Sequence, residues 1–395
     1  MKILMVNKFL YPNGGSETYI FKLGKQLESL GHQVQYFGME HEGRCVGNHA
    51  QQYTTDMDFH GGSMLSKITY PVKTVYSAEA KRKMTVVLND FQPDIIHINN
   101  FNYQLTPSII YAADSYKKRA GKRVKIVFTA HDYQLVCPNH MMFDINGNVC
   151  EDCVTKGYTS CIKKRCIHGS RAKSIIGATE ASLYRALKTY KMIDSVICCS
   201  EFLKSKMDTN PVFASKTIAL HNFIERVTDD NTAKDDYVLY FGRYDKEKGI
   251  ELIMKAKDIS FVCAGSGELE KEINKQPHIK NVGFKSGDEL KSLIQRAKCS
   301  VYPSVWYENC PFSVMESIMY GTPVVGSRIG GIPELIEDGK TGILFEAGNT
   351  EAMENAINKI LLNDDLAKEM SVNCKKARFD TVSEYTEKLL KIYNS

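Results

Sequence analysis

Short apolar runs separated by segments of helical periodicity recur along the whole chain. Each run has four to seven residues, which suits a buried strand and is far short of the ~20 residues that a membrane-spanning helix needs. Strands that alternate with helices form parallel sheets covered by helices. The pattern therefore predicts an α/β fold, with strands at residues 3–6, 34–37, 95–98, 124–130, 195–199, 237–241, 260–264, 281–284, 299–302, 323–326 and 342–345.

A polar run at residues 228–236 interrupts this rhythm and cannot pack into a core. We therefore expect two doubly wound, Rossmann-like parallel sheets that face a central cleft, where the carboxyl ends of the strands would bind ligands. The last helix follows a complete second sheet, so it either crosses back to the first domain or caps the second. The predicted organisation is a first domain at 1–200, a linker region at 201–236, a second domain at 237–378 and a terminal helix at 379–395.

Two glycines, Gly14 and Gly15, lie between the first predicted strand and an amphipathic helix. Glycines at such a turn let backbone N–H groups approach an anion, and the helix amino terminus adds a partial positive charge. The loop therefore suits a phosphate, while a tight turn that needs positive φ explains the glycines equally well. It is not a dinucleotide fingerprint, because no G-x-G-x-x-G follows the strand.

Arg243 and Lys248 follow the first strand of the second half. Arginine offers a planar fork of donors and lysine a point charge, and this pair suits a diphosphate. Because their segment starts at the carboxyl end of a strand, we expect both cations to face the cleft.

A helix is expected to start at Pro311, because proline suits the first helical position. The backbone N–H groups of the next three residues would then point unbonded toward the cleft. Those residues are Phe312, Ser313 and Val314.

Two glutamates flank this helix start. Glu316 is expected to project from the first turn, where a carboxylate can accept both ribose hydroxyls of a nucleotide. Glu308 lies before the helix in a mostly apolar run, which argues against a solvated helix face. We expect Glu308 beside the group that the phosphate carries.

Taken in order, these motifs resemble the retaining glycosyltransferases of family 4, which have the two-domain GT-B fold. The resemblance rests on the Gly14-Gly15 loop, the Arg243 and Lys248 pair, the Glu308 to Glu316 spacing and the Gly-Gly-Ile-Pro-Glu turn at 330–334. It implies transfer of a sugar from a nucleotide diphosphate donor, a UDP- or GDP-sugar, by a hexosyltransferase. It covers nearly the whole chain and implies that the first domain is on the acceptor side and that the second binds the nucleotide sugar.

The resemblance also implies roles for single residues. Those matching Arg243 and Lys248 bind the donor diphosphate, the one matching Glu316 binds the ribose, and the one matching Glu308 lies beside the transferred sugar. The base is expected near Phe284, and the turn with Gly265 and Gly267 is expected to line the donor pocket.

Two histidines end predicted strands of the first half. His131 resembles the family histidine that contacts the donor sugar, although histidines in such positions often serve only the structure. His97 is a second candidate, on the acceptor side.

Five cysteines fall between residues 137 and 170, in an insertion of the first domain. The two-residue gap between Cys150 and Cys153 lets both thiolates bind one tetrahedral ion, and Cys161 with Cys166 would complete a structural Zn²⁺ site. Cys137 or His168 could replace one of them. The alternative is a set of buried thiols, and the family chemistry requires no metal.

Charge is divided unevenly along the chain. The first 200 residues hold 25 Lys and Arg against 16 Asp and Glu, a net +9, and the net charge of the whole chain is +5. The basic segments 117–125 and 163–173 favour an anionic membrane surface or a lipid-linked diphosphate, although most such clusters are simply solvated. Nucleic acid is a poorer partner, because no aromatic platforms interleave with the charge.

The combined expectation is a cytoplasmic enzyme, peripheral at the inner face of the membrane, since no export signal is visible in the sequence. It would act in polysaccharide biosynthesis on a glycan or lipid-linked oligosaccharide, with retention of anomeric configuration and without a catalytic metal. Two alternatives stay open: a synthase or phosphorylase of the same fold with a small phosphorylated acceptor, and a nucleotide-sugar-binding module without turnover.

Overall fold

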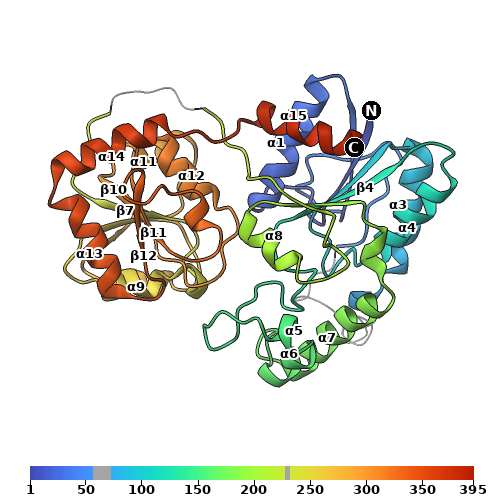
Figure 1. The fold of residues 1–395 in the computed structure, drawn as a ribbon, viewed down its shortest axis with the longest axis horizontal. Helices are drawn as coiled ribbons and strands as arrows, with labels where there is room; N and C mark the ends of the chain where they lie inside the picture. The colour runs from blue at the N-terminus through green and yellow to red at the C-terminus, as the bar shows by residue number, and fades with distance from the viewer. Residues whose placement is uncertain (57–72, 227–231) are drawn as a thin grey trace. The chain divides into compact units, whose positions relative to one another are not determined.

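The computed structural model describes residues 1–56, 73–226 and 232–395. The chain forms two compact units, each built on one sheet (Figure 1). The first comprises Met1–Ile145, Cys150–His221 and Val382–Ser395, and the second Asn146–Val149 and Asn222–Thr381. The predicted α/β fold with two doubly wound parallel sheets is confirmed.

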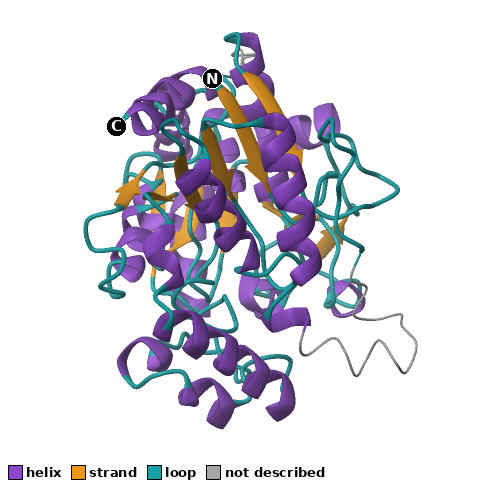
Figure 2. Ribbon diagram, turned by 90° about the vertical axis from the view of Figure 1, so that its right-hand side faces the viewer, coloured by secondary structure: helices purple, strands orange, loops and turns teal. Residues whose placement is uncertain are grey.

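The first sheet has six parallel strands in the order β2-β1-β3-β4-β5-β6, with helices packed along it (Figure 2). Its strand order reverses between β1 and β3, and such a switch point is where open α/β sheets bind ligands. The strands are β1 (Lys2–Val6), β2 (Gln33–Phe37), β3 (Ile95–Ile98), β4 (Lys125–Ala130), β5 (Ser195–Cys198) and β6 (Thr217–Ala219). The helices of this unit are α1 (Gly15–Ser29), α3 (Ala78–Phe91), α4 (Ser108–Arg119), α5 (Asp152–Thr155), α6 (Thr159–Lys164), α7 (Arg171–Ala186), η1 (Thr189–Met192), α8 (Glu201–Met207) and α15 (Val382–Asn394).

The second sheet has the order β12-β11-β10-β7-β8-β9, again all parallel, which is the arrangement of classic dinucleotide-binding folds. Its switch point lies between β7 and β10. The strands are β7 (Val238–Phe241), β8 (Phe261–Ala264), β9 (Ile279–Asn281), β10 (Cys299–Tyr302), β11 (Val324–Ser327) and β12 (Gly342–Phe345). The helices are η2 (Lys246–Lys248), α9 (Ile250–Lys255), α10 (Glu270–Ile273), α11 (Gly287–Arg296), α12 (Phe312–Met319), η3 (Ile332–Glu334), α13 (Thr350–Leu361) and α14 (Asp364–Lys376).

Two sequence-based boundaries differ from the structure. Residues 201–219, assigned above to the linker region, form α8 and the edge strand β6, which pairs with β5. No side chain of β6 is buried, so this strand lacks the apolar run that marks a buried one. Strand β9 ends at Asn281, because the chain turns at Gly283 with a φ of 71°. The polar run expected as the linker falls partly on residues 227–231, which lie outside the described residues.

The terminal helix α15 packs in the first unit, against α1. Its Tyr385 hydroxyl lies 2.8 Å from that of Tyr19, and its Tyr393 hydroxyl lies 2.6 Å from Nδ1 of His97. Lys125 donates a hydrogen bond to the carbonyl of Ile392, near the end of the helix. A cation at this place also complements the negative end of the helix dipole.

His97 should make folding sensitive to acid. Burial, with a smaller contribution from His131, lowers the pKa of His97 to about 3 in the folded protein. The folded state therefore favours neutral His97. This contribution to the free energy of unfolding is complete above the unfolded pKa of ~6.5 and is lost as the pH falls toward the folded value. Between pH 6.5 and 4.5 the unfolding free energy of the wild type should fall by about 2–3 kcal/mol more than that of His97→Gln. Urea unfolding at several pH values measures this, and a constant difference between the two proteins would contradict it.

Candidate functional site

The switch point of the second sheet brings the loop after β7 against the loop after β10. Gly249 allows this approach, because a Cβ there would lie 1.8 Å from the carbonyl oxygen of Pro303 and its φ is 71°. A hydrogen bond from the Val305 amide to the Glu247 carbonyl, 3.0 Å long, joins the same two loops.

Lys248 and Glu308 meet at this junction although sixty residues separate them. Lys248 Nζ lies 2.6 Å from Glu308 Oε1, and the Ser304 hydroxyl donates to the same oxygen at 2.9 Å. The side chain of Glu308 is 9% exposed and that of Lys248 is 23% exposed. The ammonium also lies over the ring of Trp306, 5.2 Å from its centroid.

The surroundings of Glu308 keep it ionised. Burial alone would raise the pKa of Glu308, but the charge of Lys248 and the hydrogen bonds from Lys248 and Ser304 outweigh burial and lower it. The site therefore holds a charged pair in a largely buried place, which is costly to maintain for packing alone.

Arg243 lies in the same loop but reaches outward. Its guanidinium contacts Asp245 at 2.5 Å and Glu247 at 3.0 Å, and its side chain is 63% exposed. These two carboxylates hold the guanidinium at the surface of the loop, where an anion can reach it.

Gly265 and Gly267 fit closely against the loop that carries Arg243. A Cβ on Gly265 would lie 1.9 Å from the carbonyl oxygen of Gly242, and one on Gly267 would lie 2.6 Å from the amide of Tyr244. These two glycines thus let the backbone after β8 pack directly against the backbone after β7. A cavity of about 220 Å³ opens beside them, and its lining includes Arg243, Gly265 and Phe284. Phe284 is 73% exposed and presents an aromatic face there.

The start of α12 differs in detail from the expectation. Pro311 is the residue before the helix, so Glu316 lies in the second turn and not the first. The amide of Val314 is bonded to the Pro311 carbonyl at 3.2 Å, and its side chain is fully buried. Within the described part of the chain, the Phe312 and Ser313 amides have no backbone acceptor, so two of the three expected N–H groups are open.

Sequence reasoning did not assign a role to Gly330. A Cβ on Gly330 would lie 2.2 Å from the Glu308 carbonyl oxygen, and the Gly331 amide donates to that oxygen at 2.7 Å. The Gly-Gly turn therefore cradles the backbone of Glu308. The motif is visible in the sequence, but its partner is not.

The first unit places Gly14 and Gly15 at the start of α1, both exposed. Gly14 has extended backbone with a φ of −175°, so a positive-φ turn does not explain it. The carboxylate of Glu17 in this first turn is buried and accepts from Asn7 Nδ2 at 2.8 Å and from Ser16 at 2.9 Å.

The two candidate histidines have different environments. His131 Nε2 lies 2.9 Å from Asn99 Oδ1, and burial lowers the pKa of His131 to about 4, so its ring is neutral at physiological pH. His97, expected on the acceptor side, is fully buried, and its nitrogens bond to Tyr393 and to Thr129, the latter at 2.7 Å. His97 therefore lies in the interior, because the residues that end a strand point alternately to either face.

Three of the four cysteines expected to bind zinc, Cys153, Cys161 and Cys166, pack together. In the described chain, no group of three Cys, His, Asp or Glu side chains is placed to hold a metal ion. Cys153 and Cys161 join a small apolar cluster with Ile167, and Cys150 accepts a hydrogen bond from Lys164 at 3.2 Å. Helix α6 ends with the Cys166 amide bonded to the Cys161 carbonyl at 3.1 Å, a C-cap that brings these two side chains together.

Some cations of the basic segments pair with aspartates. Lys117 pairs with Asp194 at 2.6 Å, Lys122 with Asp94 at 2.5 Å and Lys164 with Asp152 at 2.8 Å. Lys118 pairs with Asp114 at 2.7 Å as well, so four of the eleven cations in these segments have a carboxylate partner in the described chain. No helix among the described residues combines the length and apolar character needed to cross a bilayer.

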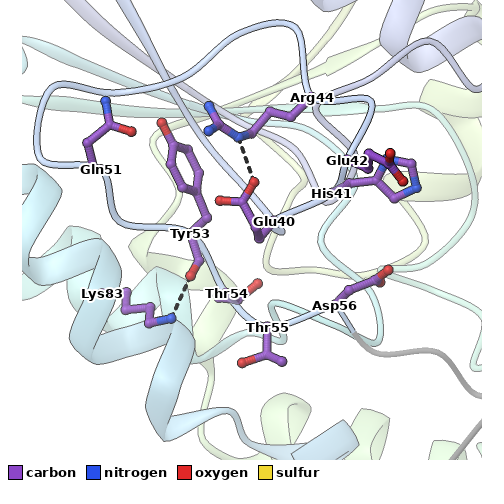
Figure 3. Close-up of a pocket in the computed structure, with 10 residues that line it drawn as sticks. All are labelled: Glu40, His41, Glu42, Arg44, Gln51, Tyr53, Thr54, Thr55, Asp56 and Lys83. Carbon is purple, nitrogen blue, oxygen red and sulfur yellow. Dashed lines mark hydrogen bonds and ion pairs between the residues drawn. The ribbon is translucent and has the colours of Figure 1, made fainter.

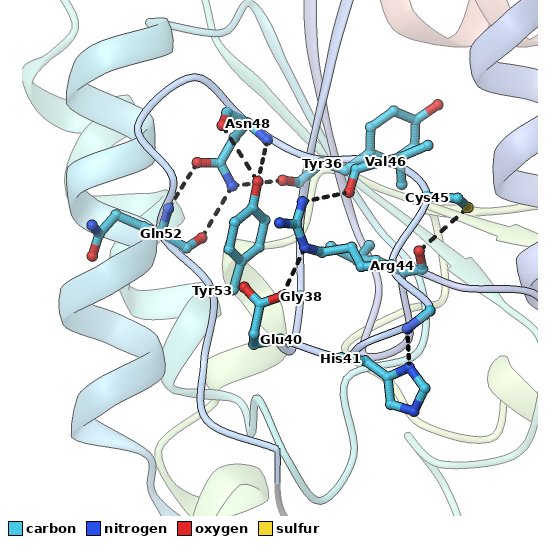
Figure 4. A network of polar contacts seen from close by, with 12 residues as sticks. Tyr36, Gly38, Glu40, His41, Arg44, Cys45, Val46, Asn48, Gln52 and Tyr53 are labelled. Atoms are coloured by element: carbon cyan, nitrogen blue, oxygen red, sulfur yellow. Dashed lines mark hydrogen bonds and ion pairs between the residues drawn. The ribbon is translucent and has the colours of Figure 1, made fainter.

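A large open cavity of about 930 Å³ adjoins the loop after β2 (Figure 3). Its lining is polar and carries both signs of charge, with Arg44 bonded to Glu40 and Lys83 to the Tyr53 carbonyl. Asn48 fixes the wall through bonds to the backbone of Tyr36 and Gln52, and the Arg44 guanidinium stacks on the Tyr53 ring at 3.9 Å (Figure 4). The loop is therefore rigidly built. The lining residues are Glu40, His41, Glu42, Arg44, Gln51, Tyr53, Thr54, Thr55, Asp56 and Lys83.

Two family models match the chain one after the other. Glycosyltransferase Family 4 matches residues 13–226, and Glycosyl transferases group 1 matches residues 224–377. The first alone spans more than half of the chain.

Curated relatives are distant. An uncharacterised glycosyltransferase of Methanocaldococcus jannaschii is 28% identical over 53% of this chain and 61% of its own length. An uncharacterised 42.6 kDa protein in the cps region of Klebsiella pneumoniae is 24% identical over 85% of this chain and 87% of its own. N-acetyl-alpha-D-glucosaminyl L-malate synthase of Bacillus anthracis is 22% identical over 98% of this chain and 94% of its own length.

Solved structures share the fold over the full length. Anabaena Alr3699/HepE, in complex with UDP, has a TM-score of 0.68 at 16% identity and covers 100% of both chains. Sucrose-phosphate synthase from Thermosynechococcus elongatus has a TM-score of 0.68 at 17% identity, over 100% of this chain and 98% of its own.

Proposed function

Because this chain belongs to glycosyltransferase family 4 and has the GT-B fold, we propose that it transfers a hexose from a UDP- or GDP-sugar to a hydroxyl group with retention of configuration. The observation that carries the proposal is the Lys248 and Glu308 pair, held at 2.6 Å at the switch point of the second sheet. Relatives with a bound UDP support a nucleotide donor.

In this proposal Lys248 and Arg243 bind the donor diphosphate, together with the open amides of Phe312 and Ser313 at the start of α12. These groups stabilise the negative charge that grows on the leaving diphosphate, and they act most strongly in the transition state. Glu316 accepts the ribose hydroxyls, and the base occupies the cavity beside Phe284.

Glu308 would bind hydroxyl groups of the transferred sugar once Lys248 turns to the phosphate. A buried carboxylate is a strong acceptor for hydroxyl donors. His131, neutral at physiological pH, would donate or accept a hydrogen bond to the sugar without adding charge. The leaving phosphate oxygen takes the proton of the attacking hydroxyl, so no catalytic metal is needed.

The acceptor is proposed to be a glycan or a lipid-linked oligosaccharide in polysaccharide biosynthesis. The Klebsiella relative in the cps region supports this role. Membrane association through the first unit is also part of the proposal: four of the eleven cations in its basic segments pair with aspartates, so positive charge remains for an anionic surface.

The experiment is a panel of nucleotide sugars incubated with the full chain and a mixture of glycoside acceptors. We expect one donor to release its nucleoside diphosphate, and NMR of the product to show the anomeric configuration of that donor. EDTA should leave the rate within about twofold. An inverted product would contradict the mechanism, and a donor that binds without nucleotide release would favour the binding module.

A further inference from the structure

Buried polar atoms without partners gather in the loops that follow β3 and β4. Among the described residues, Asn100 Oδ1, Gln104 Oε1 and both amide atoms of Gln134 are buried and have no hydrogen-bond partner. Gln134 is 8% exposed. Each such group costs about 1–3 kcal/mol, so native proteins keep few of them without a ligand or ordered water.

These loops lie at the switch point of the first sheet. Strands β3 and β4 are parallel neighbours, and β1 lies on the other side of β3, so the loops after all three strands share one edge. Lys8 follows β1, and its amide donates to the Asn100 carbonyl at 2.7 Å. Its own carbonyl accepts from the Met39 backbone N–H at 3.0 Å, two residues after β2 ends.

Two charged groups face the same region. Asp132 follows β4, and its carboxylate accepts a hydrogen bond from the backbone N–H of Gln134 at 2.8 Å. Burial raises the pKa of Asp132 to about 6, and the charge of Lys8 opposes this shift. Within the described chain, the Lys8 ammonium has no hydrogen-bond acceptor, although burial lowers its pKa.

The orientation of Asn100 is fixed by its neighbours. The Ser16 hydroxyl donates its only hydrogen bond to Glu17 Oε1 at 2.9 Å. It must therefore accept the hydrogen bond that Asn100 Nδ2 donates at 3.0 Å. The oxygen of Asn100 is therefore the open atom. Both side-chain amide atoms of Gln134 lack a hydrogen-bond partner among the described residues, so exchanging its nitrogen and oxygen would leave the same donor and acceptor unpaired.

The open atoms indicate what kind of ligand fits. Three amide oxygens and a carboxylate require donors, whereas one amide nitrogen and one ammonium require acceptors. A phosphate offers acceptors only at neutral pH, while each hydroxyl group donates one hydrogen bond and accepts two. An uncharged polyhydroxyl compound therefore matches the edge better than a phosphorylated one.

We propose that this edge, the hydroxyl site, binds the hydroxyl groups of an uncharged sugar, with Gln134 and Asp132 as its principal contacts. The hydroxyl site consists of Lys8, Asn100, Gln104, Asp132 and Gln134. That this sugar is the acceptor rests on the proposed function. It favours a glycan over the small phosphorylated acceptor of a synthase or phosphorylase.

The first test separates binding from structure. Gln134→Leu removes a buried amide that has no partner among the described residues, so the melting temperature should stay equal or rise. A melting temperature lower than that of the wild type by more than about 4 °C would show that the amide has a structural partner, and would overturn the proposal.

The second test measures binding without turnover. Methyl glycosides of glucose, galactose, mannose and N-acetylglucosamine are added singly to the full chain, with glucose 6-phosphate and mannose 6-phosphate as charged counterparts. We expect at least one methyl glycoside to raise the melting temperature, and the shift to vanish in Gln134→Leu and Asp132→Asn. Gln295→Leu is the control, because Gln295 lies in α11 of the second unit and is as buried as Gln134. This variant should keep the shift.

Three results would overturn the hydroxyl site: no shift with any methyl glycoside, a shift that survives both variants, or a larger shift with the sugar phosphates. UDP and GDP are tested on the same proteins. A nucleotide shift that persists in Gln134→Leu while the glycoside shift disappears supports both proposals, and absence of any nucleotide shift counts against the donor site alone.

Discussion

Lys248→Met is expected to lower sugar transfer by about 10²- to 10³-fold, because it removes the cation that we propose stabilises the leaving diphosphate. It should also destabilise the second unit by about 3–5 kcal/mol, since Glu308 then keeps a buried charge without its partner. Steady-state kinetics and urea unfolding measure the two effects separately.

The double variant Lys248→Met with Glu308→Gln distinguishes the roles. It removes both charges, so most of the lost stability should return while transfer stays low. Lys246→Met is the matched control, because Lys246 lies in the same short helix η2 and its side chain is exposed. Transfer near the wild-type rate in the double variant would refute the assignment of the diphosphate to Lys248.

Gly330→Ala is expected to reduce transfer by about 10²-fold or more, although Gly330 carries no functional group. Its new Cβ would lie 2.2 Å from the carbonyl oxygen and 2.7 Å from the amide of Glu308, so the backbone of Glu308 must move. A displacement of about 1 Å at a reacting centre can cost that much. The φ of 59° adds strain of about 1 kcal/mol or more.

Gly339→Ala provides the control for strain alone. Gly339 has a φ of 79° and nothing within 4 Å of its Cβ position. This variant should lose about 1 kcal/mol of stability and keep its transfer rate. Equal losses of activity in both variants would mean that strain, not the contact with Glu308, limits transfer.

The candidate site shows where sequence reasoning stops. The motif at 308–316 marks Glu308 and Glu316, but the bond from Lys248 to Glu308 joins residues sixty positions apart. Ser304 and Gly330 were missed for the same reason: a hydroxyl and a glycine acquire a role only through the neighbour that the fold brings to them.

The histidines and cysteines show a second limit. His97 lies near the end of β3 and His131 follows β4, yet only the structure shows that Tyr393 of the terminal helix covers His97. The spacing of Cys150 and Cys153 suits zinc, but spacing cannot show whether side chains converge. In the structure Cys153, Cys161 and Cys166 pack in one apolar cluster and Cys150 contacts Lys164, but among the described residues no three such side chains are placed to hold a metal ion.

The sequence by itself determined the class of fold, the alternation of strands and helices and the order of the family motifs. Buried strands and amphipathic helices each have a characteristic local spacing of apolar residues, which can be recognised in the sequence. Only the tertiary structure decided the strand orders, and with them which loops share a switch point. It also revealed that the amide oxygen of Asn100 and both side-chain amide atoms of Gln134 are buried without a hydrogen-bond partner among the described residues. Whether a polar atom has a partner depends on distant segments, so no local pattern can record it.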